Sequence, residues 1–378
     1  MYDSGPTRIS LWQLLVLAIG VLMGTSTLLP AGTPAGKDAW LAVLVAAGLG
    51  VLLTSVWQGL ITACTEGGHT KERGGRGRQE GQRWEENIWV AAFGPWTGRI
   101  VSAIYFVYFT HLVTLVLRNI TSLIGIEVLT RTPTPVILVA LVGLAVWSAS
   151  QGPEGTARLA EVVIPLAFLG STFLVILALL TPGLVDMSQL KPVLERGYRP
   201  FFHGMMEALT FPFGELVALL PLALSLQQPA RAAVPLRWAI LVGGLLLAAQ
   251  EVRNIAILGV HEAVRFIFPG LAVNKLIELG RVVERIETIA IFVWVNAGFI
   301  KLTVVLLAAT NSVRELLDLK VHKQMPPVIA AIGLVAGALT VGLYSTDTEM
   351  VRFAADIWPV YAPIFQLIIP VLALVSAR

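Results

Sequence analysis

The sequence contains few charged residues and a single cysteine. Asp, Glu, Lys and Arg make up only 13% of its 378 residues, about half of their share in soluble domains. Because Cys64 is alone, an internal disulfide and a metal cluster held by cysteines are excluded. The sequence also has no P-loop and no G-x-S-x-G motif, and His261-Glu262 is not followed by a second histidine at metal-ligand spacing. We therefore expect neither enzymatic activity nor a cofactor or bound metal.

Long apolar runs are present instead, since 56% of the residues are hydrophobic. A helix needs about 20 mostly apolar residues to cross a bilayer, and ten runs have roughly this length. The sequence therefore predicts an all-α, polytopic membrane protein that forms a single bundle over residues 1–378. The ten predicted spans are residues 10–29, 38–63, 97–128, 134–150, 159–181, 201–226, 236–262, 282–311, 326–344 and 354–377.

The distribution of lysine and arginine predicts that both termini are cytoplasmic. The loops after the second and eighth spans are basic, whereas the loops at 183–200 and 263–281 mix bases with acids. Basic loops stay preferentially on the cytoplasmic side. Residues 66–83, rich in glycine and arginine, have the composition of a flexible cytoplasmic loop, with nucleic-acid or lipid binding as the alternative. Elsewhere the chain offers no basic soluble face, so nucleic acid is not an expected partner.

Two apolar spans are interrupted by residues that do not continue a helix. The first span contains a glycine-rich stretch, Gly20–Pro30, and the sixth contains Phe211-Pro-Phe-Gly-Glu215. Irregular backbone at membrane depth is tolerated only where protein or a water-filled cavity supplies hydrogen-bond partners. Matched interruptions in two halves point to the binding site of a transporter-type fold. We therefore predict inverted five-helix repeats, about 1–182 and 183–378, with broken first and sixth helices that enclose a polar pocket.

The first interruption supplies candidate ligand-binding groups. Small residues there can unwind the helix and expose backbone N–H groups, which suit a carboxylate. An alternative is a packing face of the GxxxG type, since Gly20 and Gly24 are four residues apart. The candidate ligand-binding residues of this interruption are Gly24, Thr25, Ser26 and Thr27.

The second interruption places an acid near the bilayer centre. Pro212 removes a helical hydrogen bond, and a charge such as that of Glu215 is costly at this depth unless it is paired or hydrated. The carboxylate could hold a ligand ammonium, carry a proton, bind a cation or form a structural ion pair. The candidate ligand-binding residues here are Phe211, Phe213, Gly214 and Glu215.

Further polar candidates lie in the third, sixth and eighth spans. Lys301 is deep in the eighth, where its ammonium could replace a sodium ion beside the first interruption; snorkelling to the inner interface is the alternative. Arg118 and Glu207 lie at similar depths, and we predict a structural or gating pair between them. Tyr108 is a candidate for the cavity wall, although aromatic residues in such helices more often serve packing.

A set of short motifs extends over essentially the whole chain: Phe211–Glu215, Ile9-Ser10 with Gln13, Gly24, Leu28–Pro30, Asp38–Leu41, Arg118-Asn119, Thr132-Pro133, Glu284–Glu287, Trp294 and Lys301. In combination, these motifs resemble the spore germination permease family, the GerAB-like B subunits of nutrient germinant receptors. Only the loop at 66–83 departs from the pattern, being longer than usual in the family.

The resemblance implies a bundle of the amino acid–polyamine–organocation superfamily with a LeuT-like inverted repeat. It also implies sensing of nutrient germinants, commonly amino acids, in the spore inner membrane, together with a larger membrane A subunit and a lipoprotein C subunit. We therefore expect a receptor subunit that binds an amino acid between the two interruptions. The alternatives are a proton- or cation-coupled amino acid transporter and a scaffold that only anchors partners.

Overall fold

The computed structural model describes residues 9–70, 88–277, 286–319 and 325–377. These residues form helices and connections, apart from one two-residue bridge between Ile9 and Leu226. Eight helical segments are long and apolar enough to cross a membrane, and α1 (Leu11–Ser26) and α5 (Thr134–Ser150) are shorter apolar helices. These segments correspond in order to the predicted spans, and the predicted all-helical membrane bundle is confirmed.

Among the eight long segments, six are each a single helix, of which α9 (Ala233–Ala263) is kinked at Gly259, and the sixth and tenth spans are divided. The sixth span consists of α7 (Tyr198–Thr210), the 3-10 helix η4 (Phe213–Leu219) and α8 (Leu220–Ala223). The tenth span consists of α13 (Asp347–Arg352), α14 (Trp358–Pro363) and α15 (Ile369–Ser376), and π-helical stretches join α13 to α14 and α14 to α15. The other five single helices are α2 (Ala39–Thr70), α4 (Pro95–Glu127), α6 (Gly152–Leu180), α11 (Glu287–Leu317) and α12 (Met325–Gly342).

Two predictions concern residues at the edges of the described ranges. Residues 66–70, expected to begin the flexible loop, instead continue α2 as a helix, and the remainder of that loop, 71–83, lies outside the described residues. Glu284 and Arg285 also lie outside them, and α11 begins at Glu287, five residues later than the start predicted for the eighth span.

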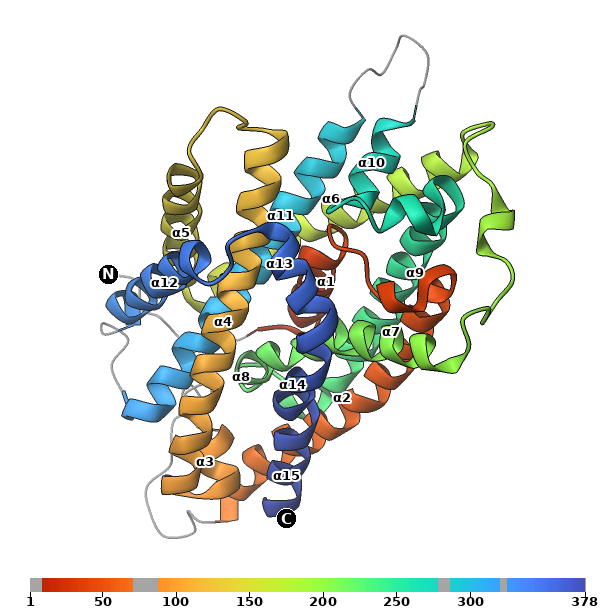
Figure 1. Cartoon of the computed structure of the whole chain (residues 1–378). Helices are drawn as coiled ribbons and strands as arrows, with labels where there is room; N and C mark the ends of the chain where they lie inside the picture. Colours follow the sequence, from red (N-terminus) through yellow and green to blue (C-terminus); the bar gives the residue numbers. More distant parts are fainter. Residues whose placement is uncertain (1–8, 71–87, 278–285, 320–324, 378) are drawn as a thin grey trace.

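Corresponding helices of the two predicted halves pack against each other. α4 packs along α11, α2 along α9, and α5 along α12. The short helices α3 (Ile88–Phe93) and α10 (Pro269–Lys275) precede α4 and α11 in the same way. Figure 1 shows α1 near the middle of the bundle, with α4 on one side of it and α9 on the other. The order of elements is consistent with the inverted repeats predicted for residues 1–182 and 183–378.

The first helix is too short to cross a bilayer by itself, and it ends later than predicted. Its 16 residues rise only about 24 Å, less than the roughly 30 Å of a bilayer core. Gly24, Thr25 and Ser26 are still helical, and the irregular stretch covers 27–32, before the 3-10 helix η1 (Thr33–Asp38). The hydroxyls of Ser26 and Thr27 donate hydrogen bonds back to the carbonyls of Leu22 and Met23. Such back-bonding satisfies the hydroxyls within the last turn, so these small residues do not unwind it.

The sixth span is broken at the predicted motif. α7 ends at Thr210, Phe211 has an extended conformation, the Phe211–Pro212 bond is cis, and η4 begins at Phe213. The carbonyl of Thr210 accepts hydrogen bonds from Trp358 Nε1 at 3.2 Å and Gln366 Nε2 at 2.9 Å. Side chains of the tenth span therefore satisfy the backbone that the interruption frees, as membrane-depth irregularity requires.

Gly24 lies where α1 and α11 cross. A Cβ atom at this position would lie 2.6 Å from the Cβ of Lys301 and 2.8 Å from its Cδ. At Gly20, a Cβ atom would lie 2.9 Å from atoms of both Ile164 and Ile300. The packing alternative for this glycine pair is therefore the one that the structure supports, and Gly24 allows the close approach of Lys301.

We expect Gly24→Ala to lower the free energy of unfolding by about 1–3 kcal/mol, because the added methyl overpacks the crossing. Gly48→Ala in α2 is the matched control, since a Cβ atom there meets nothing within 4 Å, and its higher helix propensity gives a neutral or slightly stabilising change. Thermal unfolding of the purified chain in detergent measures both. Equal melting temperatures for the two variants would contradict the packing role.

Candidate functional site

A buried ion pair joins the sixth span to α11, and a hydrogen bond connects it to the first span. The Nζ of Lys301 on α11 lies 2.5 Å from Oε2 of Glu215 in η4 and donates a hydrogen bond of 2.6 Å to Oγ1 of Thr25 on α1. The side chains of Lys301 and Glu215 are 0% and 1% exposed. Three elements that are distant in the sequence thus converge on one ammonium group, and Lys301 does not snorkel to an interface.

The pair makes the site electrically neutral. Burying either charge alone would cost several kcal/mol, and mutual attraction offsets that cost only with good geometry and further partners. Besides bonding to Thr25, the ammonium lies over the ring of Phe211, 4.8 Å from the ring centroid. The aromatic face adds a cation–π attraction in a desolvated place. The last turn of α1 and the interruption of the sixth span therefore both contribute to holding Lys301.

A small cavity lies against this pair. Its volume is about 20 Å³, room for about one water molecule. Four of its lining residues, Thr25, Phe211, Glu215 and Asn119, are polar or belong to the interruptions. The rest of the wall is apolar and comes from the first span, from α4 and from the first half of the tenth span: Leu29, Leu112, Leu115, Val116, Met350, Ala354 and Trp358.

Three of the predicted ligand-binding residues line the cavity, namely Thr25, Phe211 and Glu215. Gly24 lies at the helix crossing, and the hydroxyls of Ser26 and Thr27 bond to their own helix. The expected N–H donors at the first interruption are also engaged, since the N–H of Thr27 bonds to Met23 and that of Leu29 to Thr25. A ligand carboxylate therefore needs other donors.

The remaining predicted residues lie behind the wall. Phe213 fits between α2 and α9, next to Gly50 and Gly244, and a Cβ atom at Gly214 would collide with Gln366 Oε1. The hydroxyl of Tyr108 accepts a hydrogen bond of 2.9 Å from Gln366, and its ring stacks near Trp358. These residues shape the backbone and the cavity wall without lining the cavity.

The face of α4 that lines the cavity was missed by the sequence analysis. Leu112, Leu115, Val116 and Asn119 line it, and their spacing of i, i+3, i+4 and i+7 is that of one helix face. This periodicity is a signal from which the wall could have been predicted. Met350, Ala354 and Trp358 of the tenth span also line the cavity at a regular spacing of four residues, across the π-helical stretch Phe353–Ile357.

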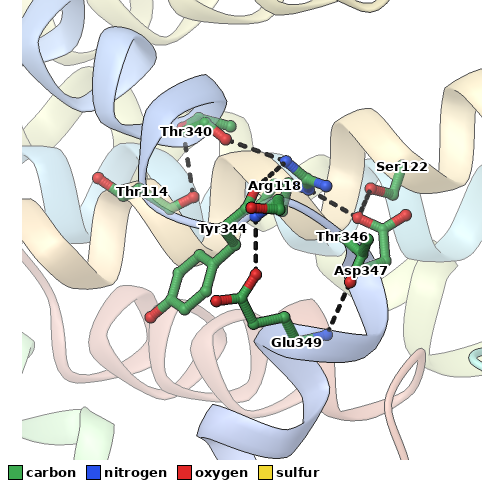
Figure 2. A network of polar contacts seen from close by, with 9 residues as sticks. Thr114, Arg118, Ser122, Thr340, Tyr344, Thr346, Asp347 and Glu349 are labelled. Carbon is green, nitrogen blue, oxygen red and sulfur yellow. Dashed lines mark hydrogen bonds and ion pairs between the residues drawn. The ribbon is translucent and has the colours of Figure 1, made fainter.

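The predicted pair of Arg118 and Glu207 is not formed. Arg118 Nε lies 2.6 Å from Asp347 Oδ1, which also accepts a hydrogen bond of 2.8 Å from Ser122 (Figure 2). Nη1 of Arg118 donates to the carbonyls of Thr340 and Tyr344. Depth alone suggested the wrong partner, because Arg118 projects from α4 toward the connection between α12 and α13. This network fastens the start of the tenth span to α4.

Glu207 instead holds the irregular stretch after α1. Its carboxylate accepts hydrogen bonds of 3.1 and 3.0 Å from the hydroxyl of Thr33. The neighbouring backbone N–H of Ala31 donates to Glu251 Oε1 at 3.1 Å. Acids from α7 and α9 thus satisfy the polar groups that the first interruption exposes.

The geometry agrees with comparisons of sequence and structure. The sequence profile of a family described as "Spore germination protein" matches residues 87–340. The chain belongs to this spore germination family. It is 26% identical to spore germination protein KB of Bacillus subtilis (strain 168) over 98% of this chain and 94% of that protein. It is also 26% identical to spore germination protein YndE of the same organism, over 60% of this chain and 62% of the relative.

The fold of this germination protein is that of a LeuT-like transporter. Mhp1, a nucleobase-cation-symport-1 family transporter solved in a closed conformation with bromovinylhydantoin bound, superposes with a TM-score of 0.55 over 94% of this chain and 77% of that chain. The identity is 15%, so the likeness shows the fold alone. The germination family and the transporter-type fold expected from the sequence are both confirmed.

We expect Lys301→Met to lower the free energy of unfolding by roughly 3–5 kcal/mol, because it leaves Glu215 buried without a countercharge. The double variant Glu215→Gln/Lys301→Met should recover most of this loss, since no net charge is then buried. Denaturation of the three proteins in detergent provides the comparison. If the double variant were as unstable as Lys301→Met, the charges of the pair would not be the cause.

Proposed function

We propose that this chain is the ligand-sensing B subunit of a nutrient germinant receptor in the spore inner membrane. Its ligand is a zwitterionic amino acid bound between the interrupted first and sixth spans. A larger membrane A subunit and a lipoprotein C subunit are the proposed partners, and both termini of the chain face the cytoplasm. The observation that carries the proposal is the Thr25–Lys301–Glu215 cluster, which connects the last turn of α1 with the interrupted sixth span beside a cavity.

The ion pair suggests how a zwitterion is bound. An α-ammonium group can replace Lys301 as the partner of Glu215, while the α-carboxylate takes the ammonium of Lys301 and the hydroxyl of Thr25. One internal ion pair is exchanged for two ligand pairs, and no net charge is buried. This mode replaces the backbone N–H donors that were expected for the carboxylate.

Binding an amino acid requires the wall to move, because the cavity has a volume of only about 20 Å³. Met350, Ala354 and Trp358 form the part of the wall that belongs to the tenth span. The tenth span has π-helical stretches at Phe353–Ile357 and Ile364–Ile368. We assign the gating role to Arg118 and Asp347, whose bond fastens the start of this span to α4. A ligand that prefers the rearranged wall shifts the population of conformations, and partner subunits can respond to that shift.

The test uses spores that carry Glu215→Gln or the double variant Glu215→Gln/Lys301→Gln. Because a close buried charge pair to a ligand is worth about 2–5 kcal/mol, we expect the nutrient concentration for half-maximal germination to rise by about 30-fold or more. Immunoblots of spore membranes test whether the variants are as abundant as the wild type. The double variant is the control for instability of Glu215→Gln, in which the charge of Lys301 is left unpaired. Wild-type sensitivity at normal abundance would refute the site, and would favour a scaffold role.

The second candidate is a proton- or cation-coupled amino acid transporter, which the transporter-type fold favours. Counterflow of labelled amino acids in proteoliposomes of the isolated chain distinguishes the two functions. Robust accumulation without partner subunits supports transport, with Glu215 or Lys301 as the proton carrier. Binding without accumulation supports the receptor.

Lys301 leads to a separate expectation about sodium. Its ammonium lies against Thr25 of the first span, and we propose that it replaces a coupling sodium ion. Amino acid affinity should therefore change by less than about twofold when sodium chloride is replaced by choline chloride, because the side chain of Lys301 already provides the positive charge. Equilibrium binding to the purified chain measures this. A clear sodium requirement would contradict the substitution.

A further inference from the structure

Asn119 is a buried amide in the cavity wall whose oxygen has no hydrogen-bond partner. The residue is 4% exposed and lines the cavity, and its Oδ1 atom has no partner among the described residues. Nearly all buried polar side-chain atoms in proteins are hydrogen-bonded, so an exception of this kind needs an explanation. A bound ligand is a suitable one, because the amide borders the space that a ligand would enter.

The surroundings of Asn119 define the chemistry that it can recognise. On the same face of α4 lie Leu112, Leu115 and Val116, which offer no hydrogen bond. The neighbouring Arg118 is engaged by Asp347. Glu215, the charged residue of the cavity wall, is already paired with Lys301. This part of the wall thus combines apolar surface with one uncharged group that both donates and accepts.

We propose that Asn119 recognises the side chain of the bound amino acid, and that the preferred ligands carry an uncharged hydrogen-bonding group, a carboxamide or a hydroxyl, on a short side chain. The inference rests on the proposed amino acid site. If Thr25, Lys301 and Glu215 hold the α-groups, the side chain extends into the rest of the cavity, where Asn119 is the polar group. A charged side chain would find no countercharge there, and a purely apolar one would leave the amide unsatisfied.

The experiment compares ligands of nearly equal shape. Equilibrium binding of labelled L-threonine against L-valine, and of L-asparagine against L-leucine, is measured on the full chain in lipid nanodiscs. We expect the polar member of each pair to bind at least about tenfold more tightly, because a polar site discriminates against analogues that leave its groups unpaired. In Asn119→Leu, and in the smaller variant Asn119→Ala, the ratio should fall to about one or reverse.

Thr121→Val is the matched control. Thr121 is on the same helix, is 1% exposed and has an Oγ1 atom without a partner among the described residues, but it does not line the cavity. Its substitution should leave both ratios unchanged. Equal melting temperatures of the variants separate recognition from folding.

Two outcomes overturn the inference, and they are distinguishable. If amino acids bind, and the double variant Glu215→Gln/Lys301→Gln abolishes binding, but Asn119→Leu keeps the wild-type preference or the wild type has none, the role of Asn119 is wrong and the proposed function stands. If none of the four amino acids binds and the double variant germinates normally, the proposed function fails as well.

Discussion

The structure depends on one buried ion pair, between Glu215 and Lys301. Neither charge is tolerated alone at membrane depth, so η4 and α11 must lie together wherever the bundle is folded. Thr25 adds the first span to the same contact. Because Glu215 also lines the cavity, the pair borders the space that a ligand would enter. One interaction therefore connects the stability of the bundle with the chemistry of the site.

The interruptions are supported by side chains from other spans. Trp358 and Gln366 bond to the carbonyl of Thr210, and Glu251 accepts from the N–H of Ala31. Each of these bonds connects an irregular backbone to a side chain of another span. The tenth and sixth spans are linked in this way, and Trp358 is itself part of the cavity wall. The same bonds that make the interruptions possible also give a route by which binding could be communicated.

The sequence predicted the site best where a rule of membrane chemistry applies to a single residue. Glu215 and Lys301 were found because charge at membrane depth is rare and needs a partner, and Phe211-Pro212 because proline cannot continue a helix. Gly24 was given a ligand role, whereas the approach of Lys301 explains it by packing. The pairing of Arg118 was wrong because its partner, Asp347, follows a turn whose direction the sequence does not specify. Asn119 was noticed only beside Arg118, although its helix face could have been predicted.

By itself, the sequence determined the helical membrane bundle, the order of its spans and the place of the second interruption, because hydropathy and proline act locally along the chain. Only the tertiary structure decided which side chain meets which across the bundle: Lys301 with Glu215 and Thr25, Glu207 with Thr33, and Asn119 with the cavity. These contacts join residues far apart in the chain, and their choice depends on helix rotation and on where α1 stops. Packing of α1 against α11 fixes how these two helices face each other, and the hydrogen bonds of Ser26 and Thr27 keep the last turn of α1 helical. The composition of one segment specifies neither.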